Sequence, residues 1–420
     1  MKTNRYSGFY KLPVRERLRE VAEFSNLTKE EEELIIDGNS LDLDIADKMI
    51  ENVIGKFTLP FAVALNFIIN GKEYLIPMVT EEASVVAAAS NAARLARETG
   101  GFFASTTDSI MIAQIQLVGV KDPNFAKMVI LDNREKIKEI CNEKDPYLVQ
   151  HGGGFVDLEV RVIESIQGQM VIIHLKVDTL DAMGANAVNT MAEAVAPFIE
   201  EITGGKVYLR ILSNLAVHRL ARSRVTISKE ALGGEEVVDG IVLAYAFAEA
   251  DPFRAATHNK GIMNGITSVV LATGNDTRAV EAGAHAYAAI TGRYTSLTTW
   301  EKNKEGNLVG TIEVPLAVGL VGGATKIHPI ARLAIKILGV STARQLAEVI
   351  ASVGLAQNLA ALRALATEGI QKGHMALHAR NVASVAGAKG ELLDRLVEIM
   401  VREKMVNVEY AKELMKKLDK

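Results

Sequence analysis

The pattern of apolar and polar positions predicts mainly helices at the start of the chain. Helical spacing of apolar residues predicts that the first 56 residues are helical and that an alanine-rich helix runs from 81 to about 98. Between them, the apolar runs 59–69 and 74–79 flank Asn70-Gly71, a pair typical of hairpin turns. We therefore expect helices packed on a β-hairpin in this part of the chain.

From about residue 108 the pattern changes to strand, helix, strand, strand, helix, strand. The strands are expected over 110–120, 156–164, 170–178 and 207–212, and the helices over 124–142 and 182–202. This order is that of the ferredoxin-like unit, β-α-β-β-α-β. It predicts a self-contained domain inserted into a larger one.

The whole chain is therefore expected to have an α+β fold with three domains. The large domain, helical and mixed, would hold residues 1–107 and 218–370, and the inserted domain residues 108–217. Residues 371–420 carry charged amphipathic helices with little strand pattern, which predicts a small helical module on a hinge.

Composition narrows the classes of function. The 420 residues are 49% hydrophobic and carry a formal net charge of -4 with interspersed signs, so no basic stripe favours nucleic acid. The single cysteine, Cys141, excludes a disulfide framework, and the histidine spacings match no metal motif. No signal peptide and no run of about 18 apolar residues is found, which predicts a cytoplasmic protein without a membrane segment.

The segment from Asp251 to Asp276 carries the most specific chemistry. Lys260 is expected on a glycine-flanked turn, and Asp276 at the end of a buried strand formed by Val269 to Leu271. A fixed cation beside a carboxylate suits a reaction that develops negative charge on a carbonyl oxygen. The structural alternative is that both residues are solvated loop residues.

Three further positions have a functional and a structural interpretation. Asp181-Ala-Met-Gly-Ala-Asn186 follows a strand and opens a helix, so Asp181 could cap the helix while Gly184 lets a pyrophosphate approach; an ordinary capped helix start is the alternative. His374 could swing over a site from the hinge, or pack on its own domain. Glu82 could be functional, or could complement the dipole of a helix start.

Five segments resemble one family, the 3-hydroxy-3-methylglutaryl-coenzyme A (HMG-CoA) reductases. They occur in the family's order. The form Asp181-Ala-Met-Gly-Ala-Asn186 and the lack of a membrane segment are similar to the class II enzymes of bacteria and archaea. The segments are Glu51-Asn-Val-Ile-Gly55, Pro77-Met-Val-Thr-Glu-Glu-Ala-Ser84, Asp181-Ala-Met-Gly-Ala-Asn186, Asp251 to Asp276 and Gly373-His-Met-Ala-Leu-His378.

The resemblance implies an architecture and a partner. It implies a large substrate domain, an inserted NAD(P)-binding domain that is not Rossmann-type, and a C-terminal flap over the site. It also implies an obligate homodimer whose active site is shared across subunits, with Glu51 to Gly55 at the junction. Further assembly of dimers is left open.

The resemblance also implies catalytic roles in the reduction of HMG-CoA to mevalonate and coenzyme A by two NAD(P)H. Lys260 would stabilise the oxyanion, and Glu82 would donate the proton to the developing alcohol. Asp276 would link Lys260 and Glu82 in one hydrogen-bonded network. His374 would protonate the departing thiolate.

Binding residues follow from the same resemblance. The substrate acid or the coenzyme A phosphates would be contacted by Ser84, Arg254, Thr257 and Asn264. The cofactor would be held by Asp181, Ala182, Met183, Gly184, Ala185, Asn186 and Asn214. Asp145 would accept from the adenine ribose hydroxyls and repel an extra phosphate, which favours NADH over NADPH.

Two other classes of function stay open at this point. A coenzyme A-thioester lyase or transferase would share the thioester chemistry without needing a dinucleotide domain. A non-catalytic homologue would be expected to have lost an acid-base group, whereas Glu82, Lys260, Asp276 and His374 are all present. The sequence does not distinguish synthesis of mevalonate from its degradation.

Overall fold

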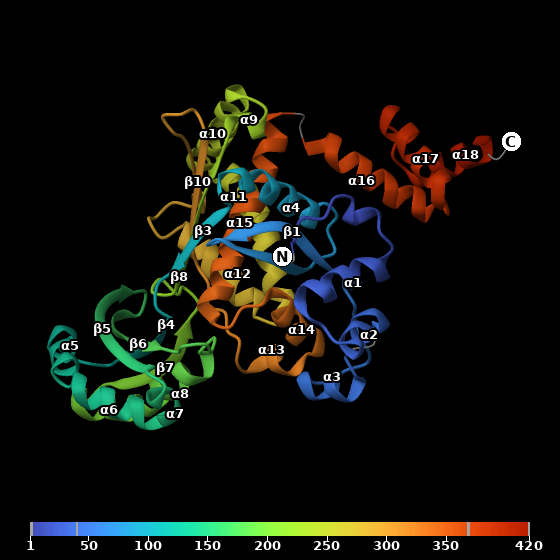
Figure 1. Cartoon of the computed structure of the whole chain (residues 1–420). Coiled ribbons are helices and arrows are strands. Elements are labelled where there is room, and N and C mark those ends of the chain that lie inside the picture. Colours follow the sequence, from blue (N-terminus) through green and yellow to red (C-terminus); the bar gives the residue numbers. More distant parts are fainter. Residues whose placement is uncertain (1–2, 39–40, 368–369, 419–420) are drawn as a thin grey trace.

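The chain forms three lobes, which Figure 1 shows in a computed structural model. The model describes residues 3–38, 41–367 and 370–418, and the backbone alone for residues 370–377. A large central lobe carries the N-terminal helices on one side. A lobe with its own sheet lies at the lower left, and the C-terminal helices lie at the upper right.

The N-terminal helices form largely as the apolar spacing predicts. Thr28 closes a capping box with Glu31 at the start of the second α-helix. The prediction that all of the first 56 residues are helical is wrong for its last part, because residues 50–60 belong to no helix or strand. The elements are η1 (Phe9–Lys11), α1 (Val14–Ser25), α2 (Lys29–Asp37) and α3 (Leu43–Met49).

The central lobe is built on a six-stranded sheet with the order β2-β1-β3-β8-β10-β9. The predicted hairpin is confirmed, since β1 and β2 pair antiparallel on either side of Asn70-Gly71. Helix α4 (Val85–Ala96) packs on β1 and is followed by η2 (Arg97–Thr99). The strands are β1 (Phe61–Ile69), β2 (Lys72–Val79), β3 (Phe102–Thr106), β8 (Leu220–Ile227), β9 (Thr298–Lys302) and β10 (Leu308–Pro315).

Two long helices, α11 (Pro252–Ala272) and α15 (Ala343–Ala366), pack against each other within the core of the central lobe. The predictions of a turn at Lys260 and of a strand at Val269 to Leu271 are therefore wrong, because both lie in α11. One of the glycines that suggested a turn, Gly265, serves helix packing instead. A methyl group on Gly265 would lie 2.9 Å from Cβ of Gln357 in α15, so only glycine lets the helices approach this closely.

By length and composition, helix α15 is long and apolar enough to cross a membrane, contrary to the expectation that the chain has no such segment. Its residues from Leu346 to Leu359 are almost all buried within the protein, and the helix contacts α4, α10 and strands β3, β8 and β10. The apolar composition of α15 is therefore explained by its place in the core.

The inserted lobe confirms the expected β-α-β-β-α-β order. Its sheet has the strand order β5-β6-β4-β7 with antiparallel pairing throughout, the ferredoxin-like arrangement. Cys141 is buried in its core and serves as an apolar filler. The elements are β4 (Ile110–Val118), α5 (Pro123–Asp132), α6 (Arg134–Lys144), α7 (Pro146–Gln150), β5 (Gly154–Ser165), β6 (Gly168–Asp178), α8 (Ala185–Thr203) and β7 (Lys206–Ser213).

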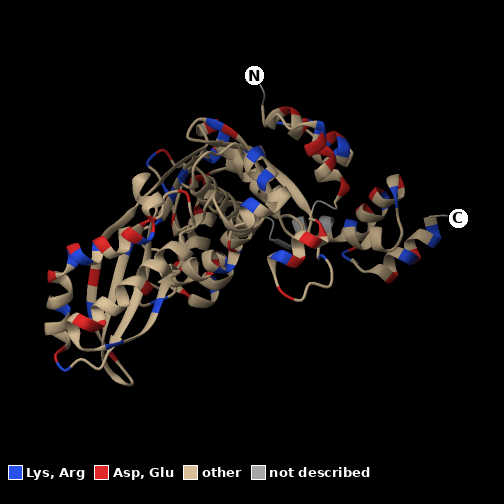
Figure 2. Cartoon of the chain, turned by 90° about the horizontal axis from the view of Figure 1, so that it is seen from below, with Lys and Arg blue, Asp and Glu red and all other residues tan. Residues whose placement is uncertain are grey.

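The remaining helices connect these units and end the chain. Helices α9 (Lys229–Leu232), α10 (Glu235–Ala250), α12 (Thr277–Ala288), α13 (Gly323–Ile327) and α14 (Pro329–Leu338) belong to the central lobe. The C-terminal helices α16 (Ile370–Val385), α17 (Gly390–Arg402) and α18 (Val408–Leu418) share an apolar cluster of their own. Acidic and basic residues are interspersed over the helices in Figure 2.

Candidate functional site

One side of α11 carries a polar stripe that contains four of the predicted site residues. Arg254, Thr257, Lys260 and Asn264 are three, three and four residues apart, a spacing that puts them on one face of a helix. Arg254 is half-buried, and burial lowers the pKa of its guanidinium. The helix therefore collects these side chains more closely than the predicted turn would have done.

Lys260 and Glu82 form an ion pair across two elements. The Lys260 Nζ lies 2.8 Å from the Glu82 Oε2, and the two side chains keep 60% and 40% of their exposure. Glu82 lies in the turn before α4, whose first residue is Val85, so it does not belong to the first helical turn as the structural alternative required. The Glu82 N–H donates to the Thr80 hydroxyl at 3.2 Å, which fixes this turn locally.

Two buried side chains next to Lys260 hold α11 in place. Asn259 donates to the Thr295 carbonyl at 2.8 Å and accepts from the Leu297 N–H at 3.0 Å. The His258 Nε2 lies 2.7 Å from the Ser296 hydroxyl, and burial lowers the pKa of His258 to about 3. These anchors fix the part of the helix that presents Lys260, and sequence spacing alone gave no sign of them.

Ser84 precedes α4 with a φ of 78°, a left-handed conformation that is uncommon for serine. It lies two residues after Glu82, at the same end of α4. His374 lies within α16, and its side chain is outside the described part of the structure.

Asp276 lies at the other end of α11 and starts the next helix. Its Oδ1 accepts from the N–H groups of Arg278 and Ala279, and the Arg278 guanidinium, 3.1 Å away, holds the pKa of this carboxyl below its usual range. From Lys260 to the last residue of α11 are twelve residues, about 18 Å at 1.5 Å per residue. Within one chain, Asp276 is therefore not placed to link Lys260 with Glu82.

The predicted cofactor residues gather around α12 instead. Asn275, beside Asp276, accepts from the Gly319 N–H at 2.8 Å, and a methyl group on Gly319 would lie 2.5 Å from the Met183 nitrogen. A methyl group on Gly283 in α12 would likewise lie 2.5 Å from the Asn214 carbonyl oxygen. The structure thus brings Asp276 together with the segments of Met183 and Asn214.

The start of α8 differs from the expected capped helix. The residue that precedes the helix is Gly184, with a φ of 97°, and the prediction that Asp181 caps α8 is wrong. The Asp181 carboxylate instead accepts from the Ala343 N–H at 2.7 Å, at the start of α15. The first-turn N–H groups of α8, from Ala185 onward, have no partner within the helix and suit an anion.

Asp145 lies in the inserted lobe, between the end of α6 and the start of α7. Its Oδ1 accepts from the Leu148 N–H at 2.9 Å and so caps α7. One carboxylate oxygen is thus engaged by the backbone, and the second is the one that a ribose hydroxyl could use.

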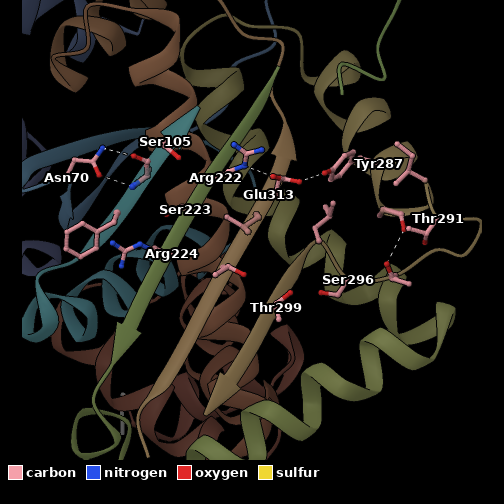
Figure 3. A pocket seen from close by; sticks show the side chains of 18 residues that line it. Asn70, Ser105, Arg222, Ser223, Arg224, Tyr287, Thr291, Ser296, Thr299 and Glu313 are labelled. Atoms are coloured by element: carbon pink, nitrogen blue, oxygen red, sulfur yellow. Dashed lines mark hydrogen bonds and ion pairs between the residues drawn. The ribbon is translucent and has the colours of Figure 1, made fainter. Parts of the chain in front are cut away.

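A pocket of about 910 Å³ lies elsewhere, on the open face of the six-stranded sheet. Arg222, Glu313 and Tyr287 form a hydrogen-bonded row across it (Figure 3). Arg224 lies over the Phe103 ring at 4.5 Å. No predicted catalytic or binding residue lines this pocket, so its size does not identify the reaction.

Two candidate chemistries can be assessed on this geometry. Burial raises the pKa of the Cys141 thiol to about 12, so it is unsuited to act as the nucleophile of a transferase. Among the described residues, no group of three histidine, cysteine, aspartate or glutamate side chains could hold a metal ion.

The fold and the site together define a class: α+β proteins that carry an inserted ferredoxin-like unit and an ion pair between a lysine of a core helix and a glutamate of a neighbouring turn. The family model for hydroxymethylglutaryl-coenzyme A reductase matches residues 13–379. The chain belongs to the hydroxymethylglutaryl-coenzyme A reductase family.

Individual relatives agree with this assignment. A 3-hydroxy-3-methylglutaryl-coenzyme A reductase of Archaeoglobus fulgidus is 62% identical over 99% of this chain and 95% of its own length. A probable reductase of Borreliella burgdorferi is 38% identical over 90% and 89%. The class II reductase of Streptococcus pneumoniae, solved with NADPH in open conformations, is 40% identical with a TM-score of 0.83, covering 97% and 100%. The resemblance to class II enzymes is confirmed, and the lyase and non-catalytic alternatives are not favoured.

Proposed function

We propose that this protein reduces HMG-CoA to mevalonate and coenzyme A, with two NAD(P)H and two protons consumed for each thioester. The observation that carries the proposal is the Lys260–Glu82 ion pair of 2.8 Å on the polar stripe of a core helix. The nicotinamide cofactor supplies the two hydrides. The residues of the chain bind the thioester, stabilise charge and transfer protons.

Lys260 has the geometry for both reductive steps. Each hydride places negative charge on the former carbonyl oxygen, and an ammonium group held in position stabilises that charge. Glu82, 2.8 Å from Lys260, then protonates the alkoxide in the second step. In the first step the carbon–sulfur bond breaks, and we assign protonation of the leaving thiolate to His374.

The polar stripe supplies the substrate contacts that we propose. Arg254 precedes Lys260 by about two helical turns and Thr257 by about one, and Asn264 follows by about one turn. Ser84 lies two residues after Glu82, directly before the start of α4. An acid group or phosphate held by Arg254 would thus lie along the same face of α11 as the reacting carbonyl.

For the cofactor, we propose the segment from Asp181 to Asn186 for the pyrophosphate, and Asn214 beside the nicotinamide. The first-turn N–H groups of α8 and the absence of a side chain on Gly184 suit an anion. The second oxygen of Asp145 would accept from the adenine ribose and disfavour a 2′-phosphate. We therefore expect a lower KM for NADH than for NADPH; equal kcat/KM for both would contradict the role of Asp145.

We also propose that two copies complete each active site. Lys260 and Asp276 are separated by about 18 Å of helix within one chain, so a network that joins them requires Asp276 of a second copy. Ile54 and Phe57 are 104% and 91% exposed in the segment 50–60, which supports burial of Glu51 to Gly55 against that copy. Residues 1–107 and 218–370, 108–217 and 371–420 are the proposed substrate, cofactor and flap domains.

The first test is the oxidation of NADH or NADPH on addition of HMG-CoA. Two cofactors oxidised per coenzyme A released would support the double reduction, and no oxidation by the folded protein would contradict it. Reduction of free mevaldehyde isolates the second step. His374→Ala should impair thioester reduction and spare mevaldehyde reduction, whereas equal loss of both would remove the assigned role. Cell fractionation would test the cytoplasmic location that we propose.

A further inference from the structure

We infer that Arg219 is a positioning residue that holds the segment Thr179 to Met183 in the conformation that directs the N–H groups of Gly184 and of the first turn of α8 toward the cofactor pyrophosphate. The inference rests on the proposed function. Arg219 lies just before β8, outside the five segments that carry the family resemblance, and is 5% exposed.

The Arg219 guanidinium binds the inner side of this segment. Its Nη1 donates to the hydroxyl of Thr179 at 2.9 Å, and to the carbonyl oxygens of Ala182 at 2.9 Å and Met183 at 3.1 Å. Its Nη2 donates to the carbonyl oxygen of Val318. All four acceptors belong to neutral groups, so the guanidinium charge interacts with backbone and hydroxyl dipoles and not with a carboxylate.

These hydrogen bonds fix the direction of successive peptide groups. The Asp181 carbonyl is held in the same way by the Leu320 N–H at 2.9 Å. Three consecutive carbonyls, from Asp181 to Met183, are thus directed into the protein. A peptide group whose carbonyl oxygen points inward presents its N–H on the opposite side. The Ala182 N–H donates to the Thr179 carbonyl at 3.0 Å, and the Met183 nitrogen faces Gly319, where a methyl group would lie 2.5 Å from it. The N–H groups left for an anion therefore begin at Gly184 and continue into the first turn of α8.

Charge supports the same role. Burial lowers the pKa of Arg219 to about 10, so the side chain stays charged at neutral pH. A cation behind a carbonyl polarises the peptide group and strengthens the N–H on its other side as a donor. The one carboxylate in the segment, Asp181, accepts from the Ala343 N–H at 2.7 Å and is thereby held at the start of α15.

The affinities for cofactor and for HMG-CoA distinguish a positioning role of Arg219 from a role in packing alone. Arg219 contacts the cofactor segment and does not belong to the polar stripe of α11. Its removal should therefore weaken binding of the pyrophosphate and leave the affinity for HMG-CoA unchanged. A general loss of structure would weaken both.

The test compares Arg219→Met and Arg219→Lys with Arg224→Met, the same change at an arginine of the adjoining strand β8 that lies over the Phe103 ring. ADP-ribose, which carries the pyrophosphate without the nicotinamide, is titrated calorimetrically. We expect its Kd to rise about tenfold or more in Arg219→Met, several-fold in Arg219→Lys, which keeps the charge without the fork, and not in Arg224→Met. The KM for HMG-CoA should stay within about twofold in all three.

An unchanged Kd for ADP-ribose in the Arg219 variants would overturn the inference, as would an equal rise in the KM for HMG-CoA. Arg219→Lys alone decides the matter if Arg219→Met does not fold. If the unsubstituted protein binds no ADP-ribose, the proposed cofactor site fails. If it binds ADP-ribose and the variants bind equally well, the role of Arg219 alone fails.

Discussion

The polar stripe of α11 and the segment Asp181 to Gly184 prepare for their ligands in different ways. On α11 the proposed reactive groups are side chains: Lys260 keeps 60% of its exposure, and its neighbours His258 and Asn259 are buried. In the segment before α8 the proposed binding groups are backbone N–H groups, and the buried Arg219 binds the carbonyl oxygens of Ala182 and Met183. The comparison teaches that side-chain chemistry needs anchors beside it, whereas backbone recognition needs a scaffold behind it.

The largest effect is expected from removing Lys260, the exposed side chain on the polar stripe of α11. Lys260→Ala removes the ammonium that stabilises the oxyanion, which should raise the barrier by about 3–4 kcal/mol and lower kcat about 10²- to 10³-fold in both reductive steps. Steady-state rates with HMG-CoA and with mevaldehyde measure this. Lys302→Ala is the matched control, since it breaks an exposed ion pair with Asp239 away from the polar stripe. A comparable loss in the control would contradict the special role of Lys260.

The backbone side should be sensitive to a single methyl group. Gly184→Ala places a Cβ 2.5 Å from the Thr179 side chain at a φ of 97°, so we expect a loss of about 1–3 kcal/mol in the free energy of unfolding. Urea unfolding measures it. Gly168→Ala, at a φ of 93° with nothing within 4 Å, has the strain without the contact. Equal losses in the two variants would show that the segment is not tightly packed.

The buried anchor of α11 should appear in the pH dependence of stability. The pKa of His258 is about 3 in the folded protein, so below the ordinary value near 6.5 the unfolded chain binds a proton that the folded chain does not. The free energy of unfolding should therefore decrease as the pH is lowered, and this group should contribute about 2 kcal/mol to the decrease between pH 7 and pH 5. His258→Gln should remove that part of the fall. Urea unfolding at the two pH values measures this change in both proteins. An equal decrease in the unsubstituted protein and in His258→Gln would contradict the burial of a neutral histidine.

The smallest effect is expected at the open side of α11. Gly261 lies in the helix with nothing within 4 Å of its added Cβ, so Gly261→Ala should stabilise the fold by about 0.5–1 kcal/mol. Gly265→Ala, one turn later, would place a Cβ 2.9 Å from Gln357 and should destabilise. Thermal unfolding of both variants gives the sign. Loss of stability at Gly261 would mean that this face of the helix is covered.

Most of the order of helices and strands could be predicted from the sequence, but some individual elements could not. The inserted unit and the hairpin at Asn70-Gly71 were predicted because their signals are local. The turn at Lys260 was wrong because Gly265 looks like a helix breaker until α15 packs against it. Contacts between distant segments decide such cases, and spacing within one segment does not record them.

The candidate site shows the same difference between local motifs and contacts that join distant segments. Resemblance to the family picked out Glu82 and Lys260, which the fold brings to 2.8 Å across 178 positions of sequence. The role of Asp181 at the start of α15 and the four hydrogen bonds of Arg219 join segments far apart in the chain. Arg219 had one local signal, a charged residue directly before the apolar start of β8, which alone does not indicate a partner.

Mixing two inactive variants tests most directly the claim that each site joins Lys260 of one copy to Asp276 of another. Lys260→Ala and Asp276→Ala are each expected to be inactive alone. After the two proteins are unfolded and refolded together in equal amounts, half of the dimers contain both, and each of these has one intact site, so about a quarter of the unsubstituted activity should return. No activity in a mixture shown to contain the mixed dimer would mean that both residues act within one chain, and would contradict the account.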